Sequence, residues 1–595
     1  MYVSHKHFNV LGLQRVTPWF EWPDLLANAW NLPKHNCNFQ GNTGNQEIQN
    51  IMIRGIFLVG LIFISNIATG QRNEAEYDTL MAEVFTPDGP GGVALVTKNG
   101  KIIYRKAIGY ANLELGVEMI PEHVFRIGSI TKQFTASAIL KLRDEGKLDL
   151  EDEITQYVKD YPTHGHTISI KHLLTHTSGI KSYTGMLEWT SEVRKKDFTP
   201  EELIDYFKYQ PMDFKPGEEY RYNNSAYFIL GYIIEVVSGK SYEAYIRENF
   251  FDPLEMNDSY YGSTSRIIHN RAAGYSKMED EYINAEFLSM TQPYAAGSLL
   301  STVDDLYTWY TAVMEDRVIS RESRIEAQST YTLNNGKKTG YGYGWALGNI
   351  QGSPMISHGG GINGYLTASI YLPEEKVFTA VFSNCNCNPP GEIAQKMAAL
   401  AIDKPFGWEP VTLPQELLQS YVGVYQSEYD GDRVITYSDG KLYSMRTGSS
   451  RYVILPYEKD KFFFEEGVST LHFVRARDHT IRAVISKGTG YDIEWVRTDR
   501  PVPEIEKIEL DNSIKEKYTG TYELTPDFVI TVFLSENTLF LKATGQEKIE
   551  IVPYETNKFS LVDVDASITF NLDENGNTES LTLYQNGEYE AKKIE

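Results

Sequence analysis

The chain has 595 residues, too many for a single hydrophobic core, so we expect several domains. It is 42% hydrophobic and 13% aromatic, which excludes a disordered chain. Its 56 basic residues against 80 acidic ones give a net charge of −24, and no lysine- or arginine-rich run stands out. This charge argues against nucleic acid and against an anionic membrane surface as partners.

Residues 52–70, MIRGIFLVGLIFISNIATG, have the layout of a secretory signal peptide. One arginine precedes an apolar run that is too short to span a bilayer comfortably, and small residues follow. Because this layout begins at Met52, residues 1–51 precede it as a leader. One hypothesis is that translation starts at Met52 and that the start at residue 1 is mis-assigned. We expect a secreted or periplasmic protein. The alternatives are a buried apolar segment or an uncleaved anchor, and only an anchor would make the membrane a partner.

Three cysteines occur, and two of them, Cys385 and Cys387, stand in SNCNCNPP. Two thiols one residue apart rarely bridge each other, because the geometry is strained. No second cysteine pair completes a four-ligand zinc site of the usual spacing. We therefore expect two inert thiols and a fold that is not built on disulfides.

Residues 75–408 mix strand and helix patterns, beginning with a hairpin over 91–111 around the turn Asn99-Gly100. A helix follows from residue 131 and ends near Gly146. A second hairpin over 364–384 and a closing helix over 389–402 complete the segment. Strands, then helices, then strands predict an α+β domain whose sheet is covered by helices.

The rest of the chain repeats itself. YVGVYQ at Tyr421 returns as YTGTYE at Tyr518, an offset of 97 residues. The same offset relates LPYEKDKFFF around Pro456 to VPYETNKFSL around Pro553, and Phe473 to Phe570. This texture of short strands and turns predicts two tandem all-β, barrel-like domains, over residues 412–500 and 510–595.

Ser129 and Lys132, in FRIGSITKQF, are the first candidates for chemistry. A serine hydroxyl needs a base within hydrogen-bond reach, and residues i and i+3 share one face of a helix. A lysine performs this role only when its pKa is lowered. The spacing alone is weak evidence, because Ser438 and Lys441 repeat it in SDGK, where we assign no chemistry.

Two further stretches strengthen the case. Tyr222 and Asn224 stand just before an apolar helix, where a tyrosine can act as base or relay and an asparagine can hold a substrate carbonyl. MISHGGGINGY then places His358 ahead of three glycines. Glycines there let a substrate lie against the backbone, and a free N–H group can serve an oxyanion hole.

These motifs, Ser-x-x-Lys, Tyr-x-Asn and His-x-Gly in this order, resemble the serine β-lactamase-related family. Three further segments are also typical of sequences in that family: LLTHTSGI, PGEEYRYNN and GSLLSTVDDLYTW. The resemblance covers residues 80–405 and implies a β-lactamase-like fold, with a mixed antiparallel sheet and a helical subdomain. The C-terminal repeats resemble, more weakly, small β domains that are appended to some members.

The resemblance implies a serine hydrolase that forms an acyl-enzyme and needs no cofactor or metal. Its catalytic residues would be the nucleophile Ser129, with Lys132 and Tyr222 sharing the role of general base. Substrate would be bound by Asn224, His358 and Gly360, and the backbone N–H groups of Ser129 and Gly361 would form the oxyanion hole.

His358 replaces the lysine that opens this motif in β-lactamases and many carboxypeptidases. A histidine is largely neutral at pH 7, so recognition of a substrate carboxylate should weaken. This favours an esterase or D-amino-acid peptidase acting on a small ester or a short, cell-wall-derived peptide. A β-lactamase or D-Ala-D-Ala carboxypeptidase is the alternative within the family. A non-catalytic acyl- or cell-wall-binding protein, or binding by the β repeats, is the alternative from another class.

Other histidines are assigned to structure. His172 and His176 stand four residues apart, but no acidic residue or cysteine is spaced to complete a metal site with them. The loop over 183–200 and the tyrosine-rich stretch 257–275 are expected to shape the substrate pocket, in a way the sequence does not reveal. No feature of the sequence points to a protein partner.

Overall fold

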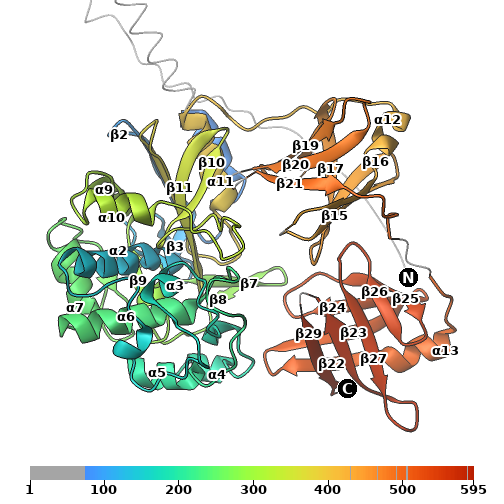
Figure 1. Ribbon diagram of the computed structural model, residues 1–595, viewed down its shortest axis with the longest axis horizontal. Coiled ribbons are helices and arrows are strands. Elements are labelled where there is room, and N and C mark those ends of the chain that lie inside the picture. The colour runs from blue at the N-terminus through green and yellow to red at the C-terminus, as the bar shows by residue number, and fades with distance from the viewer. Residues whose placement is uncertain are drawn as a thin grey trace, which may run out of the picture. The chain divides into compact units, whose positions relative to one another are not determined.

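The computed structural model describes residues 74–428, 430–465, 467–488, 490, 492–503, 507–585 and 587–594. The leader at 1–51 and the expected signal peptide at 52–70 lie outside these residues. Within the described part, an α+β domain comes first and two closed β-barrels come after it, as the sequence predicts (Figure 1).

A six-stranded antiparallel sheet in the order β10-β11-β12-β13-β1-β2 forms the centre of the first domain. Its strands are β1 (Gly92–Lys98), β2 (Lys101–Ile108), β10 (Ala346–Ile350), β11 (Ser353–Ile362), β12 (Tyr365–Leu372) and β13 (Val377–Ser383). Both predicted hairpins are confirmed. The turn between β1 and β2 uses Asn99 and Gly100 at φ of 52° and 77°, the left-handed conformation that these residues tolerate best. β1 pairs with β13, so segments from both ends of the domain meet in one sheet.

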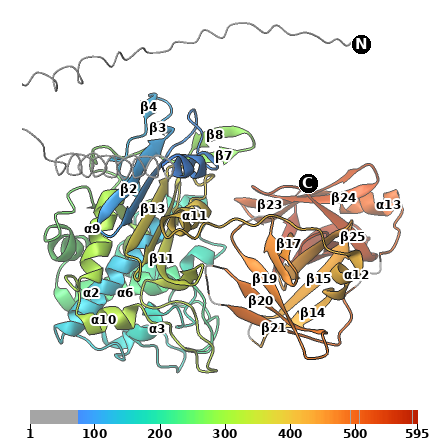
Figure 2. The ribbon, with the colours of Figure 1, turned by 90° about the horizontal axis from the view of Figure 1, so that it is seen from above.

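The two faces of the sheet bury different side chains. On β1, Val93 and Leu95 belong to one apolar core and Ala94 and Val96 to another, as the alternation of a strand requires. Helix α11 (Gly391–Ala401), the predicted closing helix, covers the second face together with a helical stretch over residues 74–82 (Figure 2). The first face packs against α9 (Val303–Met314) and the helical subdomain.

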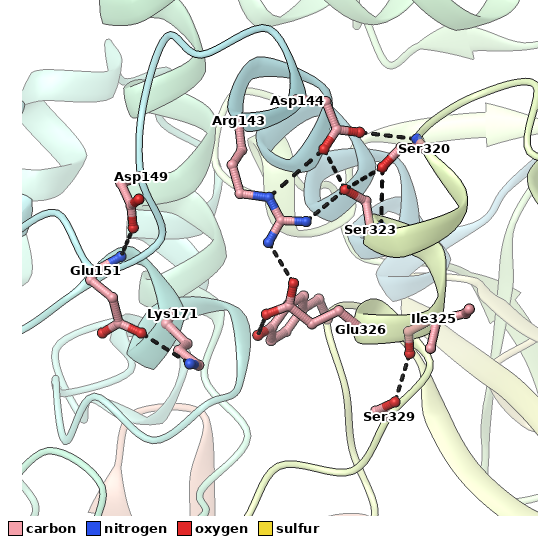
Figure 3. A network of polar contacts seen from close by, with 11 residues as sticks. Arg143, Asp144, Asp149, Glu151, Lys171, Ser320, Ser323, Ile325, Glu326 and Ser329 are labelled. Atoms are coloured by element: carbon pink, nitrogen blue, oxygen red, sulfur yellow. Dashed lines mark hydrogen bonds and ion pairs between the residues drawn. The ribbon is translucent and has the colours of Figure 1, made fainter.

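The helical subdomain is built around α2 (Thr131–Asp144) and α6 (Asn224–Ser238), with the short α8 (Tyr294–Gly297) packed on both. Helix α2 ends at Asp144, with Gly146 just beyond it at φ 70°, as predicted. Arg143, in the last turn of α2, forms an ion pair at 2.5 Å with Glu326 of helix α10 (Arg321–Ala327) (Figure 3). Among the described helices, none is both long enough and apolar enough to cross a bilayer.

Shorter elements surround this core. The helices are α3 (Ile170–Leu174), α4 (Ser191–Arg194), α5 (Pro200–Phe207) and α7 (Tyr242–Ile246). The strands are β3 (Tyr110–Asn112), β4 (Val117–Glu118), β5 (Phe125–Arg126), β6 (Tyr260–Tyr261), β7 (Tyr275–Met278), β8 (Glu281–Asn284) and β9 (Leu299–Ser301). The small sheet β5-β9-β6 fixes the segment that leads into α2.

Each repeat forms a closed antiparallel barrel of eight consecutive strands. Barrel 1 comprises β14 (Gly423–Gln426), β15 (Asp432–Ser438), β16 (Lys441–Arg446), β17 (Arg451–Glu458), β18 (Lys461–Phe464), β19 (Thr470–Arg475), β20 (Ile481–Lys487) and β21 (Ile493–Arg497). Barrel 2 comprises β22 (Gly520–Thr525), β23 (Phe528–Ser535), β24 (Thr538–Ala543), β25 (Ile549–Glu555), β26 (Lys558–Leu561), β27 (Ser567–Leu572), β28 (Thr578–Tyr584) and β29 (Glu588–Lys593). Short helices α12 (Gln415–Ser420) and α13 (Asn512–Lys515) precede them.

The residues that repeat in the sequence make the same contacts in both barrels. In barrel 1 the Tyr425 hydroxyl donates to the Tyr421 carbonyl at 2.7 Å, and in barrel 2 Tyr522 donates to Tyr518 at the same distance. A tyrosine thus braces the start of each barrel in the same way.

The expectation of two free thiols at Cys385 and Cys387 is wrong, because the two residues form a disulfide. The chain turns sharply after β13, where the Ser383 hydroxyl bonds both the N–H and the carbonyl of Cys385. This turn brings the two cysteine Cα atoms to 5.1 Å, within the range a disulfide accepts. The bridge closes a local loop and does not join distant parts of the fold.

Candidate active site

Ser129 lies at the junction between the small sheet and α2. Strand β5 is followed by a single 3₁₀ turn over Gly128–Ile130, and α2 begins at the next residue. Gly128 adopts φ 50°, and a Cβ atom there would lie 2.9 Å from the amide nitrogen of Gly361. A glycine is therefore needed before the serine, since the turn lies directly against β11.

Lys132, the second residue of α2, is fully buried and points back at Ser129. Its Nζ lies 3.0 Å from Ser129 Oγ, 2.9 Å from Asn224 Oδ1 and 2.8 Å from the Ala296 carbonyl oxygen. Burial holds the pKa of Lys132 well below its usual value. Among the described residues, no carboxylate forms an ion pair with Lys132, so no opposite charge offsets this desolvation.

Tyr222 lies against both Lys132 and Ser129. Its ring centroid is 4.7 Å from Lys132 Nζ, and its hydroxyl interacts with Ser129. Desolvation raises the pKa of Tyr222 above its usual value, so the phenol keeps its proton at neutral pH. The buried ring of His176 supports Tyr222 at a centroid distance of 4.3 Å. This position agrees with the structural role that the sequence indicates for His176.

Asn224 is the first residue of α6, and Asn223 caps this helix by accepting from the Ala226 N–H group at 2.9 Å. The side chain of Asn224 is held at both ends: Oδ1 accepts from Lys132, and Nδ2 donates to Thr184 Oγ1 at 3.1 Å. Asn224 therefore orients Lys132 as well as bordering the space in front of Ser129.

The glycines after His358 lie in β11 against the turn that carries Ser129. A Cβ at Gly360 would overlap the Ile127 carbonyl oxygen, and Thr367 Oγ1 donates to that same oxygen at 3.1 Å. Gly360 is thus a point of close backbone approach. Gly361, the next residue, borders the same cavity as Ser129, where the motif predicts the oxyanion hole.

His358 belongs to the same strand, β11, and both of its ring nitrogens are engaged. Nε2 is 2.9 Å from the Tyr341 hydroxyl, and Nδ1 is 2.6 Å from the Gly359 carbonyl oxygen. The carbonyl can only accept, so Nδ1 carries the proton and Nε2 accepts from Tyr341. Burial, with Lys132 nearby, lowers the pKa of His358 to about 4, and the ring is neutral at pH 7.

A cavity of about 110 Å³ opens in front of Ser129. The sequence does not predict most of its walls, although the loop over 183–200, expected to shape the pocket, supplies three of them. The residues from that loop are Tyr183, Thr184 and Trp189, and the wall residues outside it that sequence reasoning did not name as candidates are Leu288, Pro293, Ala296, Gly297, Ile362 and Asn363. None of the described residues that line the cavity carries a charged side chain. The tyrosine-rich stretch 257–275 contributes no lining residue among those described.

Two polar contacts fix the aromatic part of this wall. Trp189 Nε1 donates to Gln292 Oε1 and the Tyr183 hydroxyl donates to the Gln292 carbonyl, both at 2.8 Å.

His172, the other histidine of the pair considered for a metal, caps α3 by accepting from the Ser169 N–H at 3.2 Å. Over the described residues, no group of three or more metal-ligating side chains is present.

Comparison with known proteins gives a consistent result. The family model described as Beta-lactamase matches residues 74–404, and a domain of unknown function (DUF3471) matches residues 505–595. The chain is 29% identical over 437 residues to Penicillin-binding protein 4* of Bacillus subtilis, covering 68% of this chain and 95% of that protein. It is also 29% identical over 313 residues to the putative penicillin-binding protein PbpX of the same organism, covering 52% and 75%.

A solved structure also resembles the chain over most of its length. The octameric penicillin-binding protein homologue from Pyrococcus abyssi matches with a TM-score of 0.50 and 26% identity, over 88% of this chain and 99% of that chain.

Proposed function

The chain belongs to the beta-lactamase family, and from this premise we propose that it is a serine hydrolase acting through a Ser129 acyl-enzyme on uncharged esters or amides. The observation that carries the proposal is the short contact between Lys132 Nζ and Ser129 Oγ, beside a cavity whose described lining residues are all uncharged. The family resemblance of the sequence motifs implies the same nucleophile, Ser129.

The contacts of Lys132 select it as the base. A neutral amine has two N–H donors and one lone pair, and two of its three partners, Asn224 Oδ1 and the Ala296 carbonyl, can only accept. The two protons therefore point at these oxygens, and the lone pair faces the Ser129 hydroxyl. The lowered pKa of Lys132 favours this neutral form.

The proposed acylation step uses these groups in turn. Lys132 Nζ takes the proton of Ser129 Oγ as Oγ bonds to the substrate carbonyl carbon, and the carbonyl π electrons move to its oxygen. The N–H groups of Ser129 and Gly361 stabilise this oxyanion. When the carbonyl re-forms, the bond to the leaving alcohol or amine breaks, and the leaving group receives the proton held by Lys132, directly or through Tyr222. Water then attacks the acyl-enzyme in the same manner and releases the acid.

The substrate class follows from charge. A substrate carboxylate would meet no cation among the described residues that line the cavity. His358, the residue at the usual lysine position, is neutral with both nitrogens occupied. Desolvating a carboxylate without a partner is costly. An uncharged ester or amide therefore suits this site better than a penicillin or a peptide with a free C-terminus.

The cellular location of the protein is a separate proposal. We infer export through residues 52–70, on the sequence pattern alone. N-terminal sequencing of the mature protein tests it: a new N-terminus near residue 70 is the expected result, and an intact N-terminal segment on the mature chain would contradict it.

The function is tested by intact-mass spectrometry after a fluorophosphonate probe. We expect one adduct on the native chain and none on Ser129→Ala. Ser438→Ala is the matched control, because Ser438 and Lys441 repeat the spacing in barrel 1 without the buried lysine. A folded native chain without an adduct would contradict the nucleophile and favour a binding protein. Strong labelling by penicillin would favour the β-lactamase or carboxypeptidase alternative.

A further inference from the structure

The interiors of the two barrels differ at three equivalent positions. The matching strand registers align these positions at offsets of 96 or 97 residues, and all of the side chains are buried. The equivalent pairs are Arg433 and Ile530, Ser444 and Leu541, and Trp495 and Ala591. Barrel 2 shows that aliphatic residues fill these positions in this fold, so the polar set in barrel 1 is not required to close a barrel.

The polar set is arranged around the guanidinium of Arg433. This side chain is 3% exposed, and its Nη1 donates to Ser444 Oγ at 2.7 Å. The guanidinium carbon lies 4.2 Å from the centroid of the Trp495 ring. Arg433 Nε and Trp495 Nε1 are both buried, and neither has a hydrogen-bond partner among the described residues. Two unsatisfied donors thus belong to side chains that contact each other in the barrel interior.

The charge of Arg433 is also uncompensated. In the part of the chain that the structure describes, no carboxylate forms an ion pair with it. Burial, together with the field of a second cation, Arg446, lowers the pKa of Arg433 to about 9. A buried guanidinium is retained in proteins when an anion or several acceptors match it.

We propose that barrel 1 binds a small monovalent anion, a halide or a short-chain carboxylate, between Arg433 Nε and Trp495 Nε1. An anion satisfies both donors, because it offers acceptors only, and it neutralises the guanidinium. The size limit follows from the barrel, since an eight-stranded interior is largely filled by its own side chains, here including Tyr425, Ile435 and Phe462. The site is separate from the Ser129 cavity, and its occupancy does not depend on the hydrolase proposal.

Hydrogen–deuterium exchange of the full-length chain tests this proposal locally. The buffer is HEPES adjusted with Tris base, so that its anion is the bulky HEPES sulfonate, which does not fit the interior. Sodium chloride or sodium acetate is then titrated in at matched ionic strength. We expect exchange in β15, β16 and β21 to slow at least fivefold with a saturating dependence on the anion. Peptides from β23, β24 and β29 of barrel 2 serve as the internal control and should not change.

Two variants sharpen the test. The triple variant Arg433→Ile, Ser444→Leu, Trp495→Ala gives barrel 1 the interior of barrel 2 and should lose the anion effect. Arg446→Gln removes an exposed positive charge from the same barrel and should keep it. If the triple variant does not fold, Arg433→Met, which keeps the length of the side chain, replaces it.

The outcomes separate the explanations. Saturating protection by chloride alone identifies a halide site, and protection by acetate as well identifies a carboxylate site; either result supports the proposal. Exchange in barrel 1 that ignores both anions would overturn it and show that water serves the two donors. Equal slowing in both barrels, or a retained effect in the triple variant, would show a general salt effect and would also overturn it.

Discussion

Gly360 offers a quantitative test of how closely β11 must approach the nucleophile. In Gly360→Ala the new Cβ would overlap the Ile127 carbonyl oxygen and lie 2.9 Å from its carbonyl carbon. Restoring a normal contact requires β11 to move away from the 3₁₀ turn by about 1 Å. The amide of Gly361 moves with the strand, because it is the next residue.

The expected effect is large and specific. A displacement of about 1 Å between the oxyanion donor and the nucleophile should lower kcat/KM about 100-fold. Overpacking should also lower the free energy of unfolding by about 1–3 kcal/mol. We would measure kcat/KM with a neutral p-nitrophenyl ester and the free energy of unfolding by urea titration.

Gly359→Ala is the matched control. Its Cβ would meet the Thr367 carbonyl oxygen at 3.4 Å, which is an ordinary contact. This variant should therefore keep kcat/KM within about threefold of the native value, which corresponds to a change of less than about 1 kcal/mol. If Gly360→Ala and Gly359→Ala behaved alike, the close approach of β11 to Ser129 would have no functional role and the reasoning would be refuted.

Three further predictions concern the base, the third motif and the cavity wall. Because protonation removes the lone pair of Lys132, kcat/KM should fall as the pH is lowered through its depressed pKa and stay high as the pH rises; a pH–rate profile that begins to rise only near pH ~10 would contradict this. Tyr341→Phe removes the donor to His358 Nε2, so urea titration should show a loss of about 1–3 kcal/mol, and an unchanged midpoint would show that this hydrogen bond contributes nothing. Trp189→Ala removes one wall of the cavity and should raise KM for neutral esters about tenfold with little change in kcat. A tenfold fall in kcat with KM unchanged would contradict this and would show that Trp189 contacts the substrate only in the transition state.

The parts of the fold that were predictable rest on local patterns. Asn99-Gly100 marks its hairpin through backbone preference alone, and Gly146 marks the end of α2 in the same way. The repeat offset of 97 predicted two similar barrels because both copies keep the same aromatic residues at the same spacing. The contact between Ser129 and Lys132 was predictable because three residues along a helix suffice to bring them together.

The parts that could not be predicted depend on tertiary contacts. Tyr341 meets His358 across 17 residues of sequence, and no spacing rule connects them. Trp189 and Leu288 share a cavity wall although 99 residues separate them. The disulfide of Cys385 and Cys387 was missed because a sharp turn, stabilised by Ser383, overrides the usual strain between such close cysteines. Long-range packing decides each of these features.

The closure of each barrel has a consequence for folding. Barrel 1 closes when β14 pairs with β21, joining Tyr425 to Arg497, and barrel 2 closes in the same way through Tyr522 and Lys593. Such long-range pairing is slow, so the edges of both repeats stay open during folding and could exchange strands. The opening strands are alike, but the closing strands carry Trp495 in one repeat and Ala591 in the other. Since an indole would overfill the position of Ala591, we expect this difference in interior size to suppress strand exchange between the two repeats.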